Sequence, residues 1–262
     1  NIIMYQKIRE PVENDFHEVN KFIVEQLHSE VSLVESIGHY IVEAGGKRMR
    51  PILVLLAARG NGIENDLHIP MAAVIEFIHT ATLLHDDVVD MSELRRGRPT
   101  VNSEWNNPSS VLVGDFIYSR AFQVLVQIAD MRIMEIIANT TNRIAEGEVL
   151  QLIEKSNPQT SEENYMRVIT NKTAILFQAA AQCGAILSKS DSEIEEALRS
   201  FGMQLGLAYQ LIDDVLDYSG TADELGKNVG DDLSEGKSTL PLIYASKNGS
   251  TAQRKVILES LN

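Results

Sequence analysis

The motif Asp-Asp-x-x-Asp occurs twice in this sequence, and this repetition constrains the fold more than any other feature. Residues 86–90 read Asp-Asp-Val-Val-Asp and residues 213–217 read Asp-Asp-Val-Leu-Asp, each at the end of a largely apolar run. Aspartates three and four positions apart lie on one face of an α-helix. Each copy therefore predicts a helix that presents several carboxylates from a single face.

Two such faces opposed across a bundle would place the carboxylates of both motifs close together. Like charges repel strongly where the dielectric constant is low, so cations must lie between them. Mg²⁺ is the usual choice, because it prefers oxygen ligands and shares them with phosphate groups. The predicted metal ligands are Asp86, Asp87, Asp90, Asp213, Asp214 and Asp217.

Prolines and apolar spacing indicate the fold class. The prolines lie where helical patterns would begin or end, and between them apolar residues recur at intervals of three and four. No alternating strand pattern with hairpin turns is evident. We predict an all-α fold, a bundle of long antiparallel helices around a central cavity. The expected helices cover 16–44, 51–60, 69–91, 109–128, 131–154, 161–188, 192–219 and 239–260.

The length and net charge of the chain limit the classes of protein to which it can belong. No Gly/Ser-rich linker divides the 262 residues, so we expect 1–262 to be a single domain, truncated at its C-terminus because it ends within a helix-like pattern. The net charge of −14 argues against nucleic acid or an anionic membrane surface as a partner. The single cysteine, Cys183, suits the cytoplasm. No apolar run approaches the ~20 residues of a transmembrane span.

Several basic segments have two interpretations each. Lys47 and Arg50, between a glycine pair and a proline, form either an anion site or a helix end with solvated charges. His79, two turns before the first motif, is either a core residue or a functional one. Arg95 and Arg96 either balance charge in a surface loop or bind phosphate oxygens as bidentate forks, and their place beside a predicted metal site favours the second interpretation.

Three further segments depend on where the cavity lies. The lysine of Lys172-Thr173 matters only if its helix lines the cavity, since lysine otherwise extends to solvent. Gly147 inside a helix indicates either close helix packing or a polar cavity lining, and the sequence favours neither. The long polar stretch 226–241 has the character of a lid, from which Lys227 and Lys237 would close on a phosphate.

Taken together, these segments resemble the trans-isoprenyl diphosphate synthases. The two aspartate motifs, in this order with these basic segments between them, are very specific, and the resemblance covers nearly the whole chain. Residues 76–82 and 164–169 are most similar to bacterial members that make octaprenyl diphosphate for quinone side chains. The resemblance implies the isoprenoid synthase fold, prenyltransferase activity and a homodimer.

The resemblance also assigns roles to residues. Both aspartate motifs would hold Mg²⁺, about three ions per active site, on the allylic diphosphate. The same diphosphate would be contacted by Arg95, Lys172, Thr173, Gln210, Lys227 and Lys237. Isopentenyl diphosphate would be held by Lys47, Arg50, His79 and Arg96. The residues expected to be catalytic are Asp86, Asp87, Asp90, Arg95, Lys172, Asp213, Asp214 and Lys227.

Product length is expected to depend on Ala81 and Thr82, one turn before the first motif. In the family a bulky aromatic residue near this place stops the growing chain early, whereas both side chains here are small. The floor of the cavity must then lie deeper, and the candidates for it are Phe122, Met134 and Ile137. Elongation of an allylic diphosphate such as farnesyl diphosphate to octaprenyl diphosphate is therefore the expected reaction.

Two alternatives remain at this point: a shorter-chain synthase making farnesyl or geranylgeranyl diphosphate, and a non-catalytic subunit of a heteromeric synthase. The latter would be expected to lose an aspartate motif, and both are intact. A terpene cyclase is disfavoured, because aromatic residues that would steady cyclic cations make up only 6% of the chain.

Overall fold

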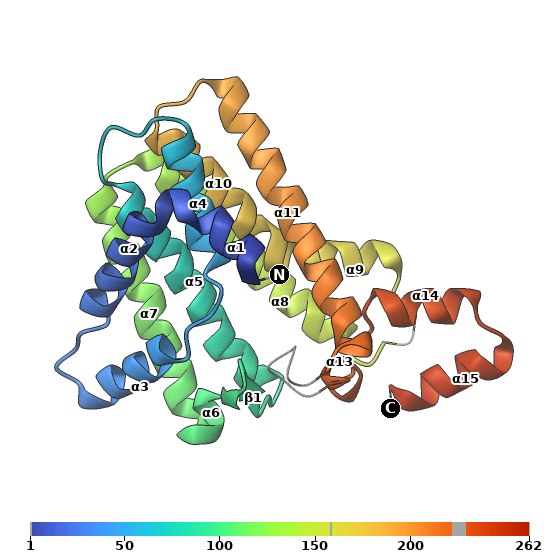
Figure 1. The fold of residues 1–262 in the computed structure, drawn as a ribbon. Coiled ribbons are helices and arrows are strands. Elements are labelled where there is room, and N and C mark those ends of the chain that lie inside the picture. Colours follow the sequence, from blue (N-terminus) through green and yellow to red (C-terminus); the bar gives the residue numbers. More distant parts are fainter. Residues whose placement is uncertain (1, 158, 222–228, 262) are drawn as a thin grey trace.

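The computed structural model describes residues 2–157, 159–221 and 229–261, and these fold into a helix bundle (Figure 1). The longest helices are α5 (His68–Val89), α7 (Asn107–Ile128), α8 (Met131–Glu154) and α11 (Ser192–Ser219). Each begins and ends within two residues of the range that the apolar spacing predicts. The prediction of an all-α bundle is therefore confirmed.

Helix α5 is the central element of this bundle. It packs against α7 on one side and against α4 (Met49–Gly60) and α10 (Ile175–Leu187) on another. Every residue from Met71 to Ile78 is buried, so this helix has no solvent face there. The first aspartate motif lies at its C-terminal end, where the helix emerges from the core.

The predicted helix 16–44 is wrong, because two helices occupy this range. After α1 (Ile2–Arg9) and a short 3₁₀ turn (Glu10–Val12), α2 covers Glu13–Gln26 and α3 covers Ser32–Glu43. Between them the Ser29 hydroxyl accepts a hydrogen bond from the Val31 amide (3.1 Å), and Val31 is extended. The apolar spacing continues across the break because both helices bury side chains against the same core.

The predicted helix 239–260 is also divided, into α14 (Leu240–Asn248) and α15 (Thr251–Ser260). Ser250 caps the second helix: its hydroxyl accepts from the Gln253 amide, and the Gln253 side chain accepts from the Ser250 amide. This reciprocal capping box starts a new helix where the sequence pattern alone continues the old one. The pair α14 and α15 extends away from the main bundle (Figure 1).

The predicted helix 161–188 is continuous but not uniform. It consists of α9 (Glu162–Ile169), a π-helical segment η2 (Thr170–Ala174) and α10. Two short helices, α6 (Val101–Glu104) and α13 (Asp231–Ser234), lie in connections. The strands β1 (Leu94–Arg95) and β2 (Arg98–Pro99) form a small antiparallel hairpin.

Helix α7 is the one helix among the described residues with the length and apolar composition of a membrane span. Buried core helices of other proteins meet the same test. In this structure 39% of the relevant stretch is buried in the bundle, on the side that faces α5. The remaining apolar side chains, such as Leu112 and Val126, are exposed.

Gly202 lets α11 approach α10 closely, and this contact generates a first prediction. A Cβ atom at this position would lie 2.5 Å from the Phe177 carbonyl oxygen, which belongs to the backbone and cannot move aside. We expect Gly202→Ala to lower the free energy of unfolding by about 1–3 kcal/mol, the usual cost of overpacking. Urea unfolding followed by circular dichroism measures this change.

The matched control is Gly60→Ala, at the exposed end of α4, where an added Cβ meets nothing within 4 Å. There the substitution should be neutral or stabilise by about 0.4–1 kcal/mol, because alanine reduces the freedom of the unfolded chain. Equal destabilisation by both substitutions would contradict the assignment of Gly202 to a close contact.

Candidate active site

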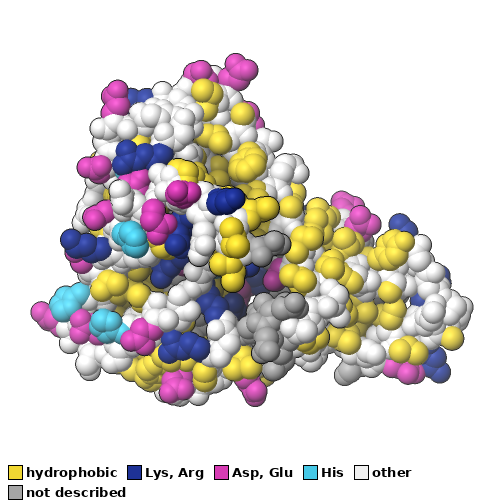
Figure 2. Space-filling view, in the orientation of Figure 1, with side chains coloured by type: hydrophobic (Ala, Val, Ile, Leu, Met, Phe, Trp, Pro, Cys, Tyr) yellow, Lys and Arg dark blue, Asp and Glu magenta, His cyan; other side chains and the backbone are white. Residues whose placement is uncertain are grey.

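A cavity of about 350 Å³ opens where α5, α8, η2, α11 and α13 meet. Figure 2 shows a hollow in this region, between the main bundle and the lobe formed by α14 and α15. Acidic side chains outnumber basic ones on its wall. The charged lining residues are Arg50, Asp86, Asp90, Arg95, Arg96, Glu148, Glu154, Lys155, Lys172, Asp213, Asp214, Asp231, Asp232, Glu235 and Lys237. A cavity with this balance favours bound cations.

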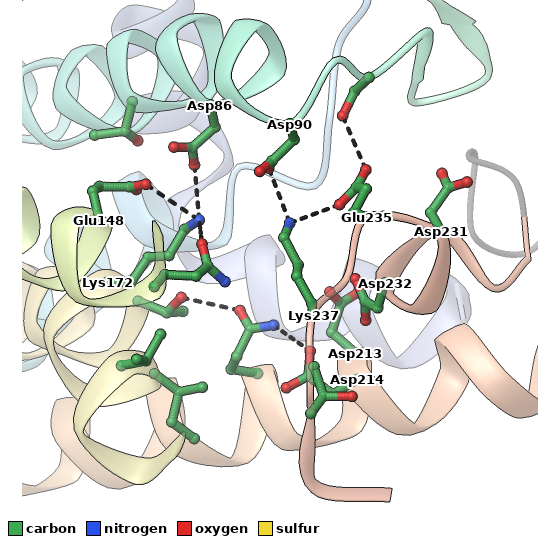
Figure 3. A pocket seen from close by; sticks show the side chains of 18 of the residues that line it. Asp86, Asp90, Glu148, Lys172, Asp213, Asp214, Asp231, Asp232, Glu235 and Lys237 are labelled. Carbon is green, nitrogen blue, oxygen red and sulfur yellow. Dashed lines mark hydrogen bonds and ion pairs between the residues drawn. The ribbon is translucent and has the colours of Figure 1, made fainter. Parts of the chain in front are cut away.

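The first aspartate motif divides between two directions. Asp86 and Asp90 project from α5 into the cavity (Figure 3). Asp87 instead turns to Arg95, whose Nε and Nη2 donate to its carboxylate at 2.9 and 2.6 Å, and it is only 3% exposed. The motif therefore supplies two cavity carboxylates and one buried anchor that holds Arg95 on the cavity wall.

Two lysines neutralise the cavity carboxylates of α5. Lys172 Nζ lies 3.3 Å from Asp86, and Lys237 Nζ lies 2.9 Å from Asp90. Each lysine also pairs with a glutamate, Lys172 with Glu148 at 3.4 Å and Lys237 with Glu235 at 2.8 Å (Figure 3). These lysines supply positive charge that a dense cluster of carboxylates would otherwise need to obtain from metal ions.

The ionisation of these groups follows from burial and charge together. Burial opposes the charged form of Asp86, but Lys172 and the other nearby cations outweigh it and lower the pKa of its carboxyl. Burial, together with the neighbouring Asp86 carboxylate, raises the pKa of Glu148 to about 9. One of these two carboxyls thus stays ionised at neutral pH while the other keeps its proton.

The second motif faces the first across the cavity. Asp213 and Asp214 line the wall from α11, opposite Asp86 and Asp90 (Figure 3). Asp217 is fully buried outside this lining, where its carboxylate accepts from the Asp232 amide (3.3 Å). This hydrogen bond connects α13 to α11. That Asp217 binds a metal stays a prediction.

The donor set suits a hard divalent cation. Every acidic group on the wall offers oxygen, as Mg²⁺ or Ca²⁺ requires, and both motifs contribute. Within residues 2–157, 159–221 and 229–261, however, no three such side chains converge tightly enough to enclose one ion. The residues thus fit a metal that completes its shell with water or with ligand oxygens. Asp86, Asp90, Asp213 and Asp214 are the residues that would hold it.

A second group of cations lines the same cavity. Arg50 Nη1 donates to His79 Nε2 at 3.3 Å, and its guanidinium stacks over the Phe177 ring at 4.5 Å. Burial and the nearby arginines hold the pKa of His79 well below its usual range, so the imidazole is neutral and accepts this bond. Arg96 completes the group, whereas Lys47 is exposed and outside the lining.

The loop before α4 is shaped around Arg96. The guanidinium donates to the Gly45 carbonyl oxygen, and a Cβ atom on Gly46 would meet it at 2.7 Å. Arg48, in a left-handed conformation with φ 53°, pairs with the buried Glu76 of α5 at 3.7 Å. This loop thus fixes Arg50 and Arg96 side by side, an arrangement that the glycine pair in the sequence makes possible.

The π-helical segment brings two neighbouring residues to the cavity. Both Lys172 and Thr173 line it, and π-helical turns occur often at functional sites. Gly147 of α8 makes room for this turn, since a Cβ atom there would lie 2.9 Å from the Asn171 Cβ. Of the two interpretations of Gly147, close packing is therefore confirmed, and the adjacent Glu148 supplies the polar lining.

The residues expected to control product length have mixed positions. Thr82 lines the cavity, whereas Ala81 is fully buried in the core beside it. Phe122 and Met134 are half-buried and Ile137 is fully buried, and none of them lies on the described cavity wall. Their role as a floor stays a prediction. Lys227 lies outside the described residues.

Sequence reasoning missed several lining residues. Glu148, Gln151 and Tyr165 lie on helices whose cavity-facing side only the packing reveals. Glu235 lies in the predicted lid near Lys237, and a carboxylate close to a lysine predicted to bind phosphate was the available signal. For the three helix residues the missing information was a contact between residues far apart in the chain.

Comparison with known proteins identifies the architecture. Residues 31–262 match the family model described as polyprenyl synthetase. The chain belongs to the polyprenyl synthetase family. The resemblance that the aspartate motifs predicted is thus confirmed, and so is prenyltransferase activity of the long-chain trans-prenyl diphosphate synthase class.

Two relatives from bacteria are similar over most of their length. The chain is 54% identical to octaprenyl diphosphate synthase of Escherichia coli K12, over 96% of this chain and 78% of that protein. It is 51% identical to all-trans-nonaprenyl-diphosphate synthase (geranyl-diphosphate specific) of Rhodobacter capsulatus, over 98% of this chain and 79% of that protein. Polyprenyl synthases that build long chains are thus among its similar relatives.

A solved polyprenyl synthase has the same architecture. The crystal structure of polyprenyl synthase from Caulobacter crescentus CB15, complexed with calcium and isoprenyl diphosphate, superimposes with a TM-score of 0.90 at 42% identity. The match covers 98% of this chain and 84% of that one. That relative therefore holds a divalent cation together with a diphosphate.

The raised pKa of Glu148 generates a prediction about stability. Its carboxyl titrates near 4.5 when unfolded and at about 9 when folded, so the folded state holds a proton that the unfolded state releases. Stability from this group is fully present below the unfolded pKa and is lost as pH rises toward the folded pKa. Glu148→Gln, which stays neutral, should therefore gain stability relative to the unsubstituted chain as pH rises.

Urea unfolding of both proteins in EDTA, at intervals from pH 5 to pH 9, measures this difference. The two stability curves should diverge steadily over this range. Parallel curves would show that Glu148 carries no extra proton in the folded protein.

Proposed function

We propose that this chain extends an allylic diphosphate, such as farnesyl diphosphate, with isopentenyl diphosphate to give octaprenyl diphosphate, with Mg²⁺ as its metal. The observation that supports this most is the opposition of two aspartate faces across one cavity that also holds two separate groups of cations. One group, Lys172 and Lys237, lies between the aspartates. The other, Arg50 and Arg96, lines the same cavity, and Arg50 contacts His79 there.

The two groups would bind two diphosphates. Asp86, Asp90, Asp213 and Asp214 would hold Mg²⁺, which would supply positive charge to stabilise the departing diphosphate. Lys172, Lys237 and Arg95 donate hydrogen bonds to that diphosphate, and their charges count most as the allylic C–O bond breaks. Arg50 and Arg96 hold isopentenyl diphosphate so that its double bond attacks the allylic cation. The released diphosphate accepts the proton that the new product loses.

The buried walls would protect the cation. Water would quench an allylic cation, so the site must exclude it during reaction. The polar cavity is bounded on the side of α5 by Thr82 and Leu83 and on the side of α9 by Val168 and Ile169. These apolar or small side chains would face the isoprenoid, while the charged groups face the diphosphates.

Product sizing tests this function directly. The protein is incubated with Mg²⁺, farnesyl diphosphate and an excess of labelled isopentenyl diphosphate, and the lipids are resolved by length. We expect a series that ends at octaprenyl length. A series that stops at geranylgeranyl length would identify a shorter-chain synthase, and no labelled lipid at all would support the non-catalytic subunit.

Thr82→Phe should shorten the products, because Thr82 lines the cavity one turn before the motif and an aromatic ring there would block the growing chain. We expect the main product to fall to geranylgeranyl length, while total incorporation of label drops less than tenfold. The matched control is Ala252→Phe on the exposed face of α15, which should leave the product series unchanged. Unchanged products from Thr82→Phe would place the growing chain elsewhere.

We also propose that the protein is a cytoplasmic homodimer of single-domain subunits. Its support is the exposed apolar surface of α7 and α8. Leu112 and Val126, 65% and 67% exposed, share one face of α7, and Val149 and Ile153, 57% and 69% exposed, share one face of α8. Apolar side chains gathered in this way mark interaction surfaces.

Leu112→Glu should therefore shift the protein toward the monomer, because it buries an unpaired charge in the proposed interface. Light scattering coupled to size-exclusion chromatography measures the mass. Val256→Glu, at a comparably exposed position on α15, is the control and should leave the mass unchanged. A dimer that tolerates Leu112→Glu as well as Val256→Glu would exclude this face.

A further inference from the structure

Two neutral side chains donate hydrogen bonds to the carboxylate of Asp214. Tyr165 Oη donates to Asp214 Oδ2, and Gln210 Nε2 donates to Asp214 Oδ1 at 2.9 Å. The Gln210 amide oxygen in turn accepts from Thr173 Oγ1 at 3.0 Å. A chain of hydrogen bonds thus runs from η2 through α11 to α9, with Asp214 near its end.

The ring of Tyr165 is fixed by packing. Tyr165 is 4% exposed and belongs to a small apolar cluster with Ile169 and Ile243, separate from the main core. Tyr165 also lines the cavity, as does Asp214. The side chain has no freedom to turn its hydroxyl elsewhere, so it sets the orientation of the carboxylate that it contacts.

A neutral donor acts on a carboxylate differently from a lysine. Asp86 and Asp90 are held by ammonium groups, which compete directly with a metal for the same carboxylates. A phenol adds no positive charge that would compete in this way, and a carboxylate oxygen that accepts one hydrogen bond can still coordinate a metal through its second lone pair. The Tyr165 hydroxyl therefore orients the Asp214 carboxylate without competing with a metal for its charge.

We infer that Tyr165 is a positioning residue, which acts through Asp214 to preorganise the second aspartate motif for a divalent cation. This inference rests on the proposed function, because it concerns the metal that the motif would hold. Hydrogen-bonding partners behind metal ligands typically change metal affinity by about 10–100-fold. The hydroxyl of Tyr165 is placed to contribute an effect of this size.

The test is Mn²⁺ binding in the presence of inorganic diphosphate, followed by the electron paramagnetic resonance signal of free Mn²⁺. Tyr165→Phe keeps the ring in its apolar cluster and removes only the donor. We expect its Mn²⁺ dissociation constant to rise about 10–100-fold. The matched control is Tyr244→Phe, which removes a hydroxyl from an exposed tyrosine of α14 and should change nothing.

Kinetics separate a positioning role from a structural one. In Tyr165→Phe the Mg²⁺ concentration that gives half-maximal activity should rise by the same factor, while kcat at saturating Mg²⁺ stays within about threefold. Loss of one buried hydrogen bond should lower the midpoint of thermal unfolding in EDTA by only a few degrees, so the variant stays folded. A loss of kcat that excess metal does not restore would overturn the inference.

A second variant guards against indirect effects. In an Asp214→Asn background, the further change Tyr165→Phe should have no additional effect on Mn²⁺ affinity, since the group that it positions is gone. Additive losses would overturn the inference, as would an unchanged affinity in Tyr165→Phe alone. If the unsubstituted protein binds no Mn²⁺ with diphosphate, the proposed function itself fails, and the two failures are thereby distinguished.

Discussion

Neutralisation of the carboxylates at the end of α5 is the constraint on which the rest of this structure depends. Asp86 and Asp90 lie at the C-terminal end of a long buried helix, where the helix dipole disfavours negative charge. Lys172 of η2 and Lys237, which follows α13, resolve this conflict by pairing with Asp86 and Asp90. The lysines come from parts of the chain far from α5 in sequence. The bundle must therefore fold completely before these carboxylates are neutralised.

The same requirement explains why the cavity wall joins so many elements. Lys237 pairs with Asp90 and with Glu235, and the Ser92 hydroxyl approaches Glu235 at 3.4 Å. On the other side, the Gly236 carbonyl accepts from the Ser156 amide at 2.7 Å. The segment after α13 is thus attached to α5 and to the end of α8. A diphosphate that binds the lysines must compete with these ion pairs. Its measured affinity is therefore the difference in free energy between lysines bound to diphosphate and lysines paired with carboxylates.

Much of this arrangement could be predicted from the sequence, because spacing and motif chemistry are local properties. The ranges of α5, α7, α8 and α11 follow from apolar periodicity. A shared cavity for the two motifs could be expected because the carboxylates of both suit the same bound cations. The turn of Asp87 toward Arg95 could not be predicted, because adjacent aspartates differ by about 100° around a helix and only the hairpin decides which finds an arginine. The pairing of Lys237 with Asp90 joins residues 147 positions apart, and no local pattern contains it.

The π-helical segment η2 has a consequence for how this part of the chain tolerates change. A π turn holds one residue more than the α-helix around it, so the helix before Thr170 and the helix after Ala174 are out of phase with each other. Loss of a single residue within Thr170–Ala174 would restore a regular helix. It would also rotate the side chains before the deleted residue by about 100° relative to those after it. Lys172 and Thr173 would then no longer face the same space. The length of this short segment, as much as its composition, is thus fixed by the chemistry of the cavity.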